Sequence, residues 1–179
     1  LMCVDEVQCG IGRTGKLFAH EWAGVKPDVL AAAKGLGGGV PVGAVLATNE
    51  AAAGMVAGTH GSTYGGNPLS TAAVNAVLDV VLEDGFLAKV IETGDYLRAE
   101  CDKLIAKYPN VFSSVRGAGL MLGLVAVPPN GDVVAAATEN GMLTVPAGDN
   151  VVRLIPPLTI GNTEVDEAIA ILDKTAASM

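Results

Sequence analysis

The sequence is poor in the residues that mark several classes of protein. Only 4% of its residues are aromatic, it has two histidines and three cysteines, and its formal net charge is −8. The cysteines, at positions 3, 9 and 101, show neither the spacing of a zinc site nor an even-numbered disulfide framework. The acidic balance without a basic stripe argues against nucleic acid as a partner, and no apolar run is as long as a membrane span. We therefore expect a reduced, cytoplasmic protein that binds neither metal, nucleic acid nor membrane.

What the sequence does contain is aliphatic and small residues. Half of its 179 residues are hydrophobic, and 23 are glycine. This composition suits an α/β fold, in which buried strands pack against helices rich in small side chains. The first four residues, Leu-Met-Cys-Val, resemble the interior of a buried strand more than a polar, loosely held terminus, so we expect further chain upstream.

Short apolar runs bounded by turn-forming residues predict the strands, and apolar residues at helical spacing predict the helices. The expected strands cover residues 1–7, 29–33, 42–48, 111–115, 120–127, 142–145 and 151–155. The expected helices cover 17–24, 49–56, 68–82, 86–108 and 133–140, and a last one opens at a capping box over 163–166. Asn49 and Asn67 are the expected N-caps of the second and third helices, with Pro68 at the first position of the third.

The order of these elements changes near residue 107. Before it, strands alternate with helices, and after it short strands come in pairs. We therefore expect a larger α/β domain over residues 1–107, ending with a long bridging helix, and a small α/β domain over 108–179.

One loop carries the glycine spacing of a dinucleotide-binding fold. Residues 10–15, Gly-Ile-Gly-Arg-Thr-Gly, match G-x-G-x-x-G and follow the first expected strand. A dinucleotide site needs a strand that runs directly into the first glycine and an acid at the end of the second strand for the ribose. Here Asp5, Glu6 and Gln8 interrupt the approach, and the second strand ends at Lys34. We therefore interpret the glycines as turn residues.

The two strand ends offer another chemistry. Asp5 ends the first strand and Lys34 the second, and α/β sheets place ligands at the carboxyl ends of their strands. Pyridoxal phosphate needs both groups, because its aldehyde condenses with an amine and a carboxylate keeps its pyridine nitrogen protonated. On spacing alone, Lys34 could equally be a solvated strand end, and Asp5 the partner of some arginine.

Four segments carry a resemblance to a known family: VDEVQCGIGRTG, PDVLAAAKGLGGGVPVGAVLAT, HGSTYGGNPLS and NVVRLIPPLTI, in this order. They resemble the class III, pyridoxal-phosphate-dependent aminotransferases of fold type I, and most of all their acetylornithine and ornithine aminotransferase branch. The resemblance covers essentially all 179 residues but only the C-terminal part of the family's chain, so it indicates a C-terminal fragment. It implies the C-terminal part of the large mixed-sheet domain followed by the small C-terminal α/β domain.

The resemblance implies roles for the residues around the first two strand ends. Lys34 would carry pyridoxal 5'-phosphate as an internal aldimine and later move a proton between substrate and cofactor. Asp5 would pair with the pyridinium nitrogen from a buried position, where a carboxylate needs a charged or hydrogen-bonding partner. Gln8 would hydrogen-bond the phenolic oxygen of the ring. Glu6 and Val7 would contact the cofactor only through backbone or packing, and a plain core valine is the alternative for Val7.

Three further residues take roles from the same resemblance. Thr63 would bind the cofactor phosphate of the neighbouring subunit, which implies a homodimer, and Ser62 would lie at the substrate site. Arg153 interrupts an apolar strand and would bind a substrate carboxylate, because a planar guanidinium suits bidentate contact. Ordinary solvent-exposed hydroxyls are the alternative for Ser62 and Thr63, and a structural ion pair is the alternative for Arg153.

The implied reaction moves an amino group from N-acetylornithine, or a related ω-amino donor, to 2-oxoglutarate in arginine biosynthesis. Ornithine, succinylornithine, succinyl-diaminopimelate and 4-aminobutyrate are the alternative donors within the family. The family's upstream half carries another phosphate-binding loop, an aromatic ring on the cofactor and another arginine, which these 179 residues do not supply. We therefore expect this fragment alone to transaminate poorly or not at all, and a catalytically incomplete remnant is the alternative to an enzyme.

Overall fold

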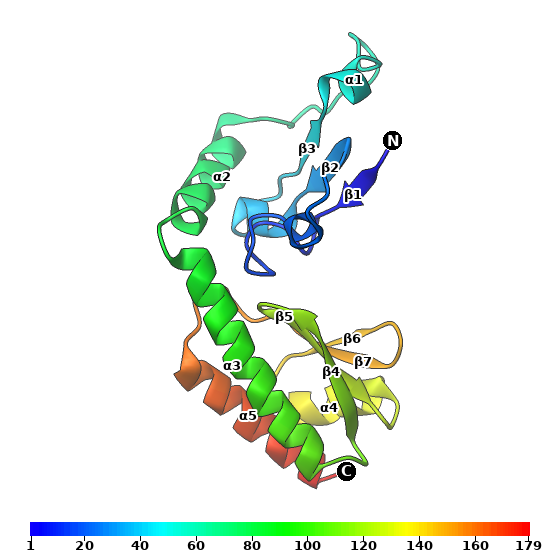
Figure 1. Ribbon diagram of the computed structural model, residues 1–179, viewed down its shortest axis with the longest axis vertical. Helices are drawn as coiled ribbons and strands as arrows, with labels where there is room; N and C mark the ends of the chain where they lie inside the picture. Colours follow the sequence, from blue (N-terminus) through cyan, green and yellow to red (C-terminus); the bar gives the residue numbers. More distant parts are fainter. The chain divides into compact units, whose positions relative to one another are not determined.

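Strands and helices alternate along the chain in the computed structural model, which describes residues 1–179. They form two units, Leu1–Leu87 and Ala88–Met179, and each unit has its own sheet (Figure 1). The expected α/β class is confirmed. Helix α3 (Phe86–Lys107) belongs to the second unit from Ala88 onward, whereas the sequence pattern counted it with the first domain. The domain boundary near residue 107 stays a prediction for the complete protein.

The sheet of the first unit has three short strands in the order β1-β2-β3. Strand β1 (Cys3–Asp5) runs parallel to β2 (Val29–Ala32), and β2 runs antiparallel to β3 (Ala44–Ala47), so the sheet is mixed. Asp5 pairs with Ala31, and the carboxyl ends of β1 and β2 therefore lie at the same end of the sheet. All three strands form inside the stretches predicted for them and are shorter than expected.

Four helical segments accompany this sheet: η1 (Ala19–Ala23), η2 (Lys34–Gly37), α1 (Asn49–Ala52) and α2 (Pro68–Val81). Helix α2 begins as predicted, because Asn67 Oδ1 accepts a hydrogen bond from the Ser70 N–H at 3.0 Å. The cap predicted for α1 is wrong by one residue. Thr48 Oγ1 accepts a hydrogen bond from the Ala51 N–H at 3.2 Å, and Asn49 already lies inside the helix.

Apolar side chains of the sheet, the glycine-rich loop, η2 and α2 form the core of the first unit. Its buried members are Ile11, Leu30, Ala32, Leu36 and Val81. A Cβ built on Gly38 would lie 2.8 Å from Val77 Cγ2 of α2, and Gly38 has a φ of 57°. Any side chain at this position would both clash and strain the backbone, so the close approach of this loop to α2 requires glycine.

The sheet of the second unit is antiparallel, in the order β4-β5-β7-β6. Its strands are β4 (Phe112–Ala118), β5 (Met121–Ala126), β6 (Val145–Ala147) and β7 (Val151–Leu154). The strand predicted over 142–145 is wrong in position, since β6 begins where the prediction ends. The Met142 N–H donates to Ala137 O at 2.9 Å and closes the end of the preceding helix, so this residue is not free to pair in the sheet.

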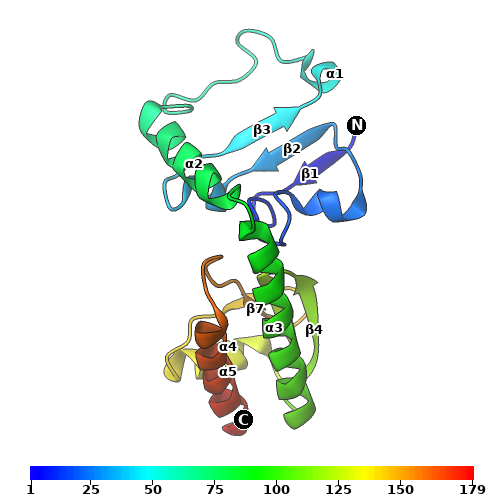
Figure 2. The same ribbon diagram turned by 60° about the vertical axis from the view of Figure 1, so that its left-hand side comes forward.

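Helices α3, α4 (Asn130–Glu139) and α5 (Asn162–Ala177) pack with this sheet (Figures 1 and 2). Two polar contacts tie α3 to α5. The Tyr96 hydroxyl donates to Asp166 Oδ1 at 2.6 Å, and Lys107 Nζ to Asp173 Oδ1 at 2.6 Å. No helix of the chain is at once long enough and apolar enough to span a membrane.

Helix α5 begins slightly earlier than the sequence predicts. Gly161 is its N-cap, and Glu164, the third helical residue, accepts a hydrogen bond from the Gly161 N–H at 2.8 Å. The glutamate half of the predicted capping box is therefore in place, but Thr163 is a helical residue and does not cap.

Helix α3 meets the turn between β4 and β5 with no side chain between them. A Cβ built on Gly94 would lie 2.5 Å from the carbonyl carbon and oxygen of Gly119, a distance that real Cβ atoms do not show. Arg98, one turn later on α3, donates to Gly117 O at 2.7 Å and holds the same contact. The helix and the hairpin are therefore fitted backbone to backbone.

Replacing Gly94 with alanine should lower the free energy of unfolding by about 1–3 kcal/mol, because the added methyl overpacks this contact. Gly131→Ala is the matched control, since Gly131 also lies in a helix, α4, and has nothing within 4 Å of the added methyl. This control should raise the free energy of unfolding by roughly 0.5–1 kcal/mol, because alanine loses less backbone entropy. Urea denaturation of the complete protein measures the free energy of unfolding of both variants. Equal changes in the two variants would contradict the close contact between Gly94 and Gly119.

Candidate functional site

Asp5 and Lys34 lie at the same end of the sheet in the first unit. Strand β1 ends at Asp5, β2 ends at Ala32, and Lys34 opens η2 two residues later. Because the two strands are parallel neighbours, the carboxylate and the amine that the sequence singled out follow adjacent strand ends. This is where sheets of α/β proteins bind ligands.

The Asp5 side chain is exposed, so the expectation of a buried carboxylate is wrong for this chain. The physical reason is its position: β1 is an edge strand of the three-stranded sheet, and nothing in the 179 residues covers it. The orientation of the carboxylate is nevertheless defined. Asp5 Oδ1 accepts a hydrogen bond from the Val7 N–H at 2.9 Å.

Lys34 has an unusual backbone conformation. Its φ is 49°, in the left-handed region, where a residue other than glycine costs about 1–2 kcal/mol. The side chain is exposed and has no hydrogen bond or ion pair within the chain. Strained backbone of this kind clusters at functional sites, where the surrounding structure holds it in place. Lys34 is thus an unpaired amine on a strained backbone.

The donor set at this sheet end fits pyridoxal phosphate. An unpaired amine can bond an aldehyde carbon, and an exposed carboxylate can hold the proton of a pyridine nitrogen. Val7 and Gln8 follow Asp5 and are half-buried. The roles of Asp5, Val7, Gln8 and Lys34 toward the cofactor stay predictions.

The Glu6 side chain is directed into the first unit and is only 2% exposed. Glu6 Oε1 lies 2.8 Å from the His20 backbone N and 3.0 Å from His20 Nδ1. Glu6 Oε2 accepts hydrogen bonds from the Ala19 N–H at 2.9 Å and the Cys9 thiol at 3.1 Å. Only the Glu6 backbone therefore remains for the cofactor contact that the resemblance implied.

The surroundings of Glu6 favour its charged form. Burial raises the pKa of Glu6, but hydrogen bonds from Cys9, from the backbone of His20 and Ala19 and from the His20 ring outweigh burial and hold this pKa below its ordinary value. Burial and the hydrogen bond to Glu6 raise the pKa of the Cys9 thiol to about 11. The thiol therefore stays protonated at neutral pH and remains a donor to the carboxylate.

The glycine run at 10–15 forms turns and opens no helix. The Gly15 N–H donates to Gly12 O at 2.9 Å, both residues are buried, and the next helical segment is η1. A dinucleotide site presents a helix N-terminus directly after its glycines, so the structure agrees with the interpretation of this run as turn residues.

Ser62 and Thr63 lie in the exposed loop between α1 and α2. Neither side chain forms a hydrogen bond within the chain. The end of the loop is held by Asn67 Nδ2, which donates to Tyr64 O at 2.8 Å. No hydrogen bond or ion pair joins Ser62 or Thr63 to the strand ends, and the substrate and phosphate roles of these residues stay predictions.

Arg153 belongs to the second unit. It lies in β7, where it pairs with Gly123 of β5 and Val145 of β6, and it is half-buried. The residues on either side of it, Val152 and Leu154, are buried. Arg153 thus comes from a different unit than Asp5 and Lys34, and its substrate role stays a prediction.

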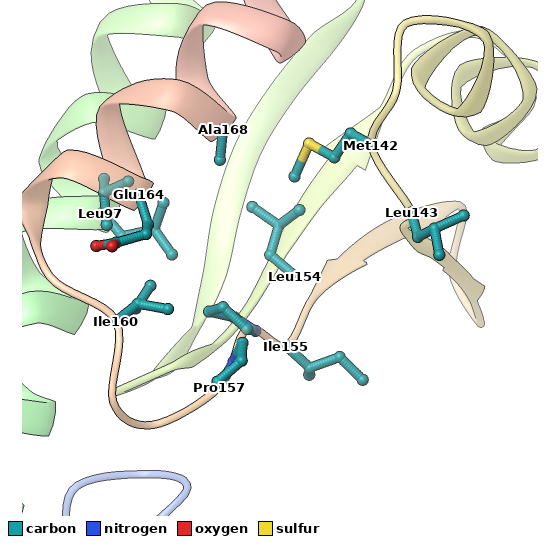
Figure 3. Close-up of a pocket in the computed structure, with 11 residues that line it drawn as sticks. Leu97, Met142, Leu143, Leu154, Ile155, Pro157, Ile160, Glu164 and Ala168 are labelled. Atoms are coloured by element: carbon teal, nitrogen blue, oxygen red, sulfur yellow. The ribbon is translucent and has the colours of Figure 1, made fainter.

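A pocket of about 350 Å³ in the second unit was not predicted from the sequence (Figure 3). It is lined by Leu97, Met142, Leu143, Leu154, Ile155, Pro156, Pro157, Ile160, Glu164, Val165 and Ala168. These residues come from segments far apart in the chain, so no local sequence pattern predicts that they form a pocket. The hydrogen bond from the Gly161 N–H lowers the pKa of Glu164, the one charged group of the lining. The pocket is therefore an apolar cavity with a single carboxylate, and that carboxylate is already hydrogen-bonded to the start of α5.

Comparisons with known proteins identify a family. The family model of the class III aminotransferases matches residues 1–176. The acetylornithine aminotransferase of Rhodobacter capsulatus is 57% identical over 179 residues, which is all of this chain and 46% of that protein. That of Mesorhizobium japonicum is 57% identical over 169 residues, 94% of this chain and 42% of that protein. The chain thus spans less than half the length of the curated relatives that it matches.

Solved structures agree with this match. The N-acetylornithine aminotransferase of Stenotrophomonas maltophilia is 37% identical with a TM-score of 0.87, over 98% of this chain and 46% of that one. The ornithine δ-aminotransferase of Plasmodium falciparum is 36% identical with a TM-score of 0.90, over 98% of this chain and 47% of that one. The fold class implied by the resemblance is confirmed.

Lys34→Gly should give a more stable cofactor-free protein than Lys34→Ala, by about 1 kcal/mol, because only glycine takes a φ of 49° without steric cost. Lys26 provides the control, since it is exposed and does not have a positive φ. There the glycine variant should be no more stable than the alanine variant. Urea unfolding of the complete protein without cofactor compares the four variants. Equal stability of the two Lys34 variants would show that this backbone is not strained.

Acid should remove the contribution of Glu6 to stability. Because its pKa is lowered in the folded protein, this contribution is complete above the ordinary pKa of 4.5 and is lost as the pH falls through the folded-state pKa. At pH 7, Glu6→Gln should lower the free energy of unfolding by about 1–3 kcal/mol. The difference from the wild type should shrink as the pH falls below 4.5. Urea unfolding of both proteins from pH 7 to below pH 4.5 measures this difference, and a difference independent of pH would contradict the lowered pKa of Glu6.

Proposed function

Because this chain belongs to the class III aminotransferase family, we propose that the complete protein is a pyridoxal-phosphate-dependent aminotransferase. Its amino donor is N-acetylornithine and its acceptor is 2-oxoglutarate, in arginine biosynthesis. The donor is supported by curated relatives of 57% identity that are named acetylornithine aminotransferases. The acceptor and the pathway follow from the resemblance of the motifs.

The observation that carries the proposal is the unpaired amine of Lys34 on a strained backbone, next to the strand that ends at Asp5. A lysine gains nothing for stability from a φ of 49°, and Lys34 forms no hydrogen bond or ion pair within the chain that would explain this conformation. A covalent role explains both features, because the side chain must be free to bond and the backbone must present it at the strand end.

Bound pyridoxal phosphate supplies a ring that accepts electrons from the substrate carbon. Lys34 would hold the cofactor through Nζ, and the same amine would move the proton at the substrate carbon that bears the reacting amine. Asp5 holds the proton on the ring nitrogen, and Gln8 hydrogen-bonds the ring oxygen. Glu6 and Val7 contribute only backbone or packing at this end of the sheet.

The exposed loop between α1 and α2 supplies the second part of the site. Thr63 binds the cofactor phosphate of the neighbouring subunit in a homodimer, which agrees with its exposure and with the absence of a hydrogen bond within its own chain. Ser62 lies at the substrate. The guanidinium of Arg153 binds the α-carboxylate of glutamate, for which its planar geometry is suited.

For the complete protein we assign residues 1–107 to the cofactor-binding domain and 108–179 to the small domain, and we place it in the cytoplasm. Ornithine is the second candidate donor, because the Plasmodium falciparum ornithine δ-aminotransferase matches with a TM-score of 0.90. A catalytically incomplete remnant is the alternative to an enzyme, because the chain spans 46% of the Rhodobacter capsulatus relative.

Borohydride reduction of the complete protein in the presence of pyridoxal phosphate should attach a pyridoxyl group to the peptide that contains Lys34. Mass spectrometry after digestion locates the label. Lys34→Ala should lose both the label and the transfer of amino groups. Lys26→Ala removes an exposed lysine from the segment between η1 and β2 and should keep both. A label on another lysine, or on none, would overturn the proposal.

The same preparation decides the donor. Glutamate formation from 2-oxoglutarate should be fastest with N-acetylornithine in a panel that also holds ornithine, succinylornithine, succinyl-diaminopimelate and 4-aminobutyrate. A preference for ornithine or 4-aminobutyrate would overturn the donor but leave the aminotransferase in place. A label at Lys34 without transfer from any donor would identify a remnant.

A further inference from the structure

The Glu6 carboxylate accepts hydrogen bonds from four donors in the segment between β1 and β2. We call this arrangement the Glu6 clasp, formed by Glu6, Cys9, Ala19 and His20. Two of the donors are the backbone N–H groups of Ala19 and His20, at 2.9 and 2.8 Å, and the others are the Cys9 thiol and the His20 ring. The carboxylate is thus fully engaged, and it ties residues 13 and 14 positions further along the chain to the end of β1.

The Glu6 backbone is held as firmly as its side chain. The Glu6 N–H donates to Ala31 O of β2 at 2.9 Å and so adds a rung beyond the last residue of β1. Glu6 therefore joins the strand pair on one side to the loop on the other. Its neighbours in the chain are Asp5 before it and Val7 after it, and Val7 donates the hydrogen bond that orients the Asp5 carboxylate.

Gly10, the first glycine of the run at 10–15, makes room for the clasp. A Cβ built on Gly10 would lie 2.7 Å from Glu6 O and 3.1 Å from Glu6 Cβ. The Gly10 N–H itself donates to Glu6 O at 3.0 Å. The absence of a side chain at Gly10 thus lets the loop fold back onto Glu6.

Only a carboxylate satisfies this set of partners. Each Glu6 oxygen faces one backbone N–H, and a glutamine would present its NH₂ group to one of the two, donor against donor. One of these two half-buried residues would then have a backbone N–H without an acceptor, in either orientation of the amide. A glutamine at position 6 therefore keeps the shape of the side chain but opens the clasp.

We propose that Glu6 is a positioning residue whose side chain sets the placement of Asp5 and Gln8 toward the cofactor ring and does not itself touch the ring. This inference rests on the proposed function, because it requires Asp5 and Gln8 to bind the cofactor. Glu6 acts through the peptide chain: it fixes the segment between Asp5 and Gln8, and through Val7 it fixes the rotation of the Asp5 carboxylate.

The test compares Glu6→Gln with Glu21→Gln in the complete protein. Glu21 is the matched control, since it lies in the same segment, is exposed and accepts a single backbone hydrogen bond, from the Phe18 N–H at 2.7 Å. Pyridoxal phosphate is titrated into the cofactor-free proteins well below their unfolding midpoints. Glu6→Gln should bind it about tenfold more weakly than the wild type and should shift the absorption maximum of the bound cofactor. Glu21→Gln should bind as the wild type does, with the same spectrum.

A second pair disturbs the clasp without changing its charge. Gly10→Ala pushes a methyl group against the Glu6 backbone, whereas Gly54→Ala adds the same methyl where nothing lies within 4 Å. Gly10→Ala should reproduce the weaker binding and the shifted spectrum of Glu6→Gln, and Gly54→Ala should not. This pair also decides the matter if Glu6→Gln does not fold.

The outcomes separate this proposal from the one on which it rests. A wild type that binds no pyridoxal phosphate at Lys34 overturns the proposed function. If the wild type binds it, but folded Glu6→Gln or Gly10→Ala binds equally tightly with an unchanged spectrum, the positioning role is overturned and the proposed function stands. If neither variant folds, Glu6 serves general stability, and the positioning role is likewise overturned.

Discussion

The parallel pairing of β1 with β2 is the constraint on which the candidate site depends. Parallel neighbours end at the same side of a sheet, so Asp5 and Lys34 follow adjacent strand ends although 28 residues separate them in the chain. The crossover between the strands holds the glycine-rich loop and η1, and the Glu6 carboxylate ties the start of η1 back to the end of β1. The segment that follows β1 is therefore held at two places, at Glu6 beside the sheet and at the start of η1.

The glycine run at residues 10–15 shows that the spacing G-x-G-x-x-G can have different structural roles. In a nucleotide-binding loop, glycines let the backbone approach a phosphate at the start of a helix. Here no helix opens at the glycines, and Gly10 lets the backbone approach Glu6 instead. In both cases the glycines lack a Cβ and so allow a close approach. The function depends on what approaches, which is a phosphate in a nucleotide-binding loop and Glu6 in this chain. For this reason the strand and charge context around the glycines was more informative than their spacing.

Local signals predicted the fold well, and long-range contacts account for the errors. The cap of α2 at Asn67 depends on residues within three positions and was predicted correctly. The start of β6 depends on pairing with β7 and on the end of α4, and was wrong by three residues. The exposure of Asp5 follows from the edge position of β1, and the burial of Glu6 follows from donors at 19 and 20. The residues next to Asp5 and Glu6 in the sequence do not indicate which of the two side chains is exposed and which is buried.

At Lys34 the left-handed backbone favours glycine for stability, whereas the proposed chemistry requires the amine of lysine. Glycine fits this conformation best, so stability alone would favour glycine over lysine at this position. A sequence in this family that has lost its chemistry should lose this side chain early, because its loss relieves strain. Lysine thus stands at position 34 against the preference of its backbone, and its amine is the property that glycine would not supply.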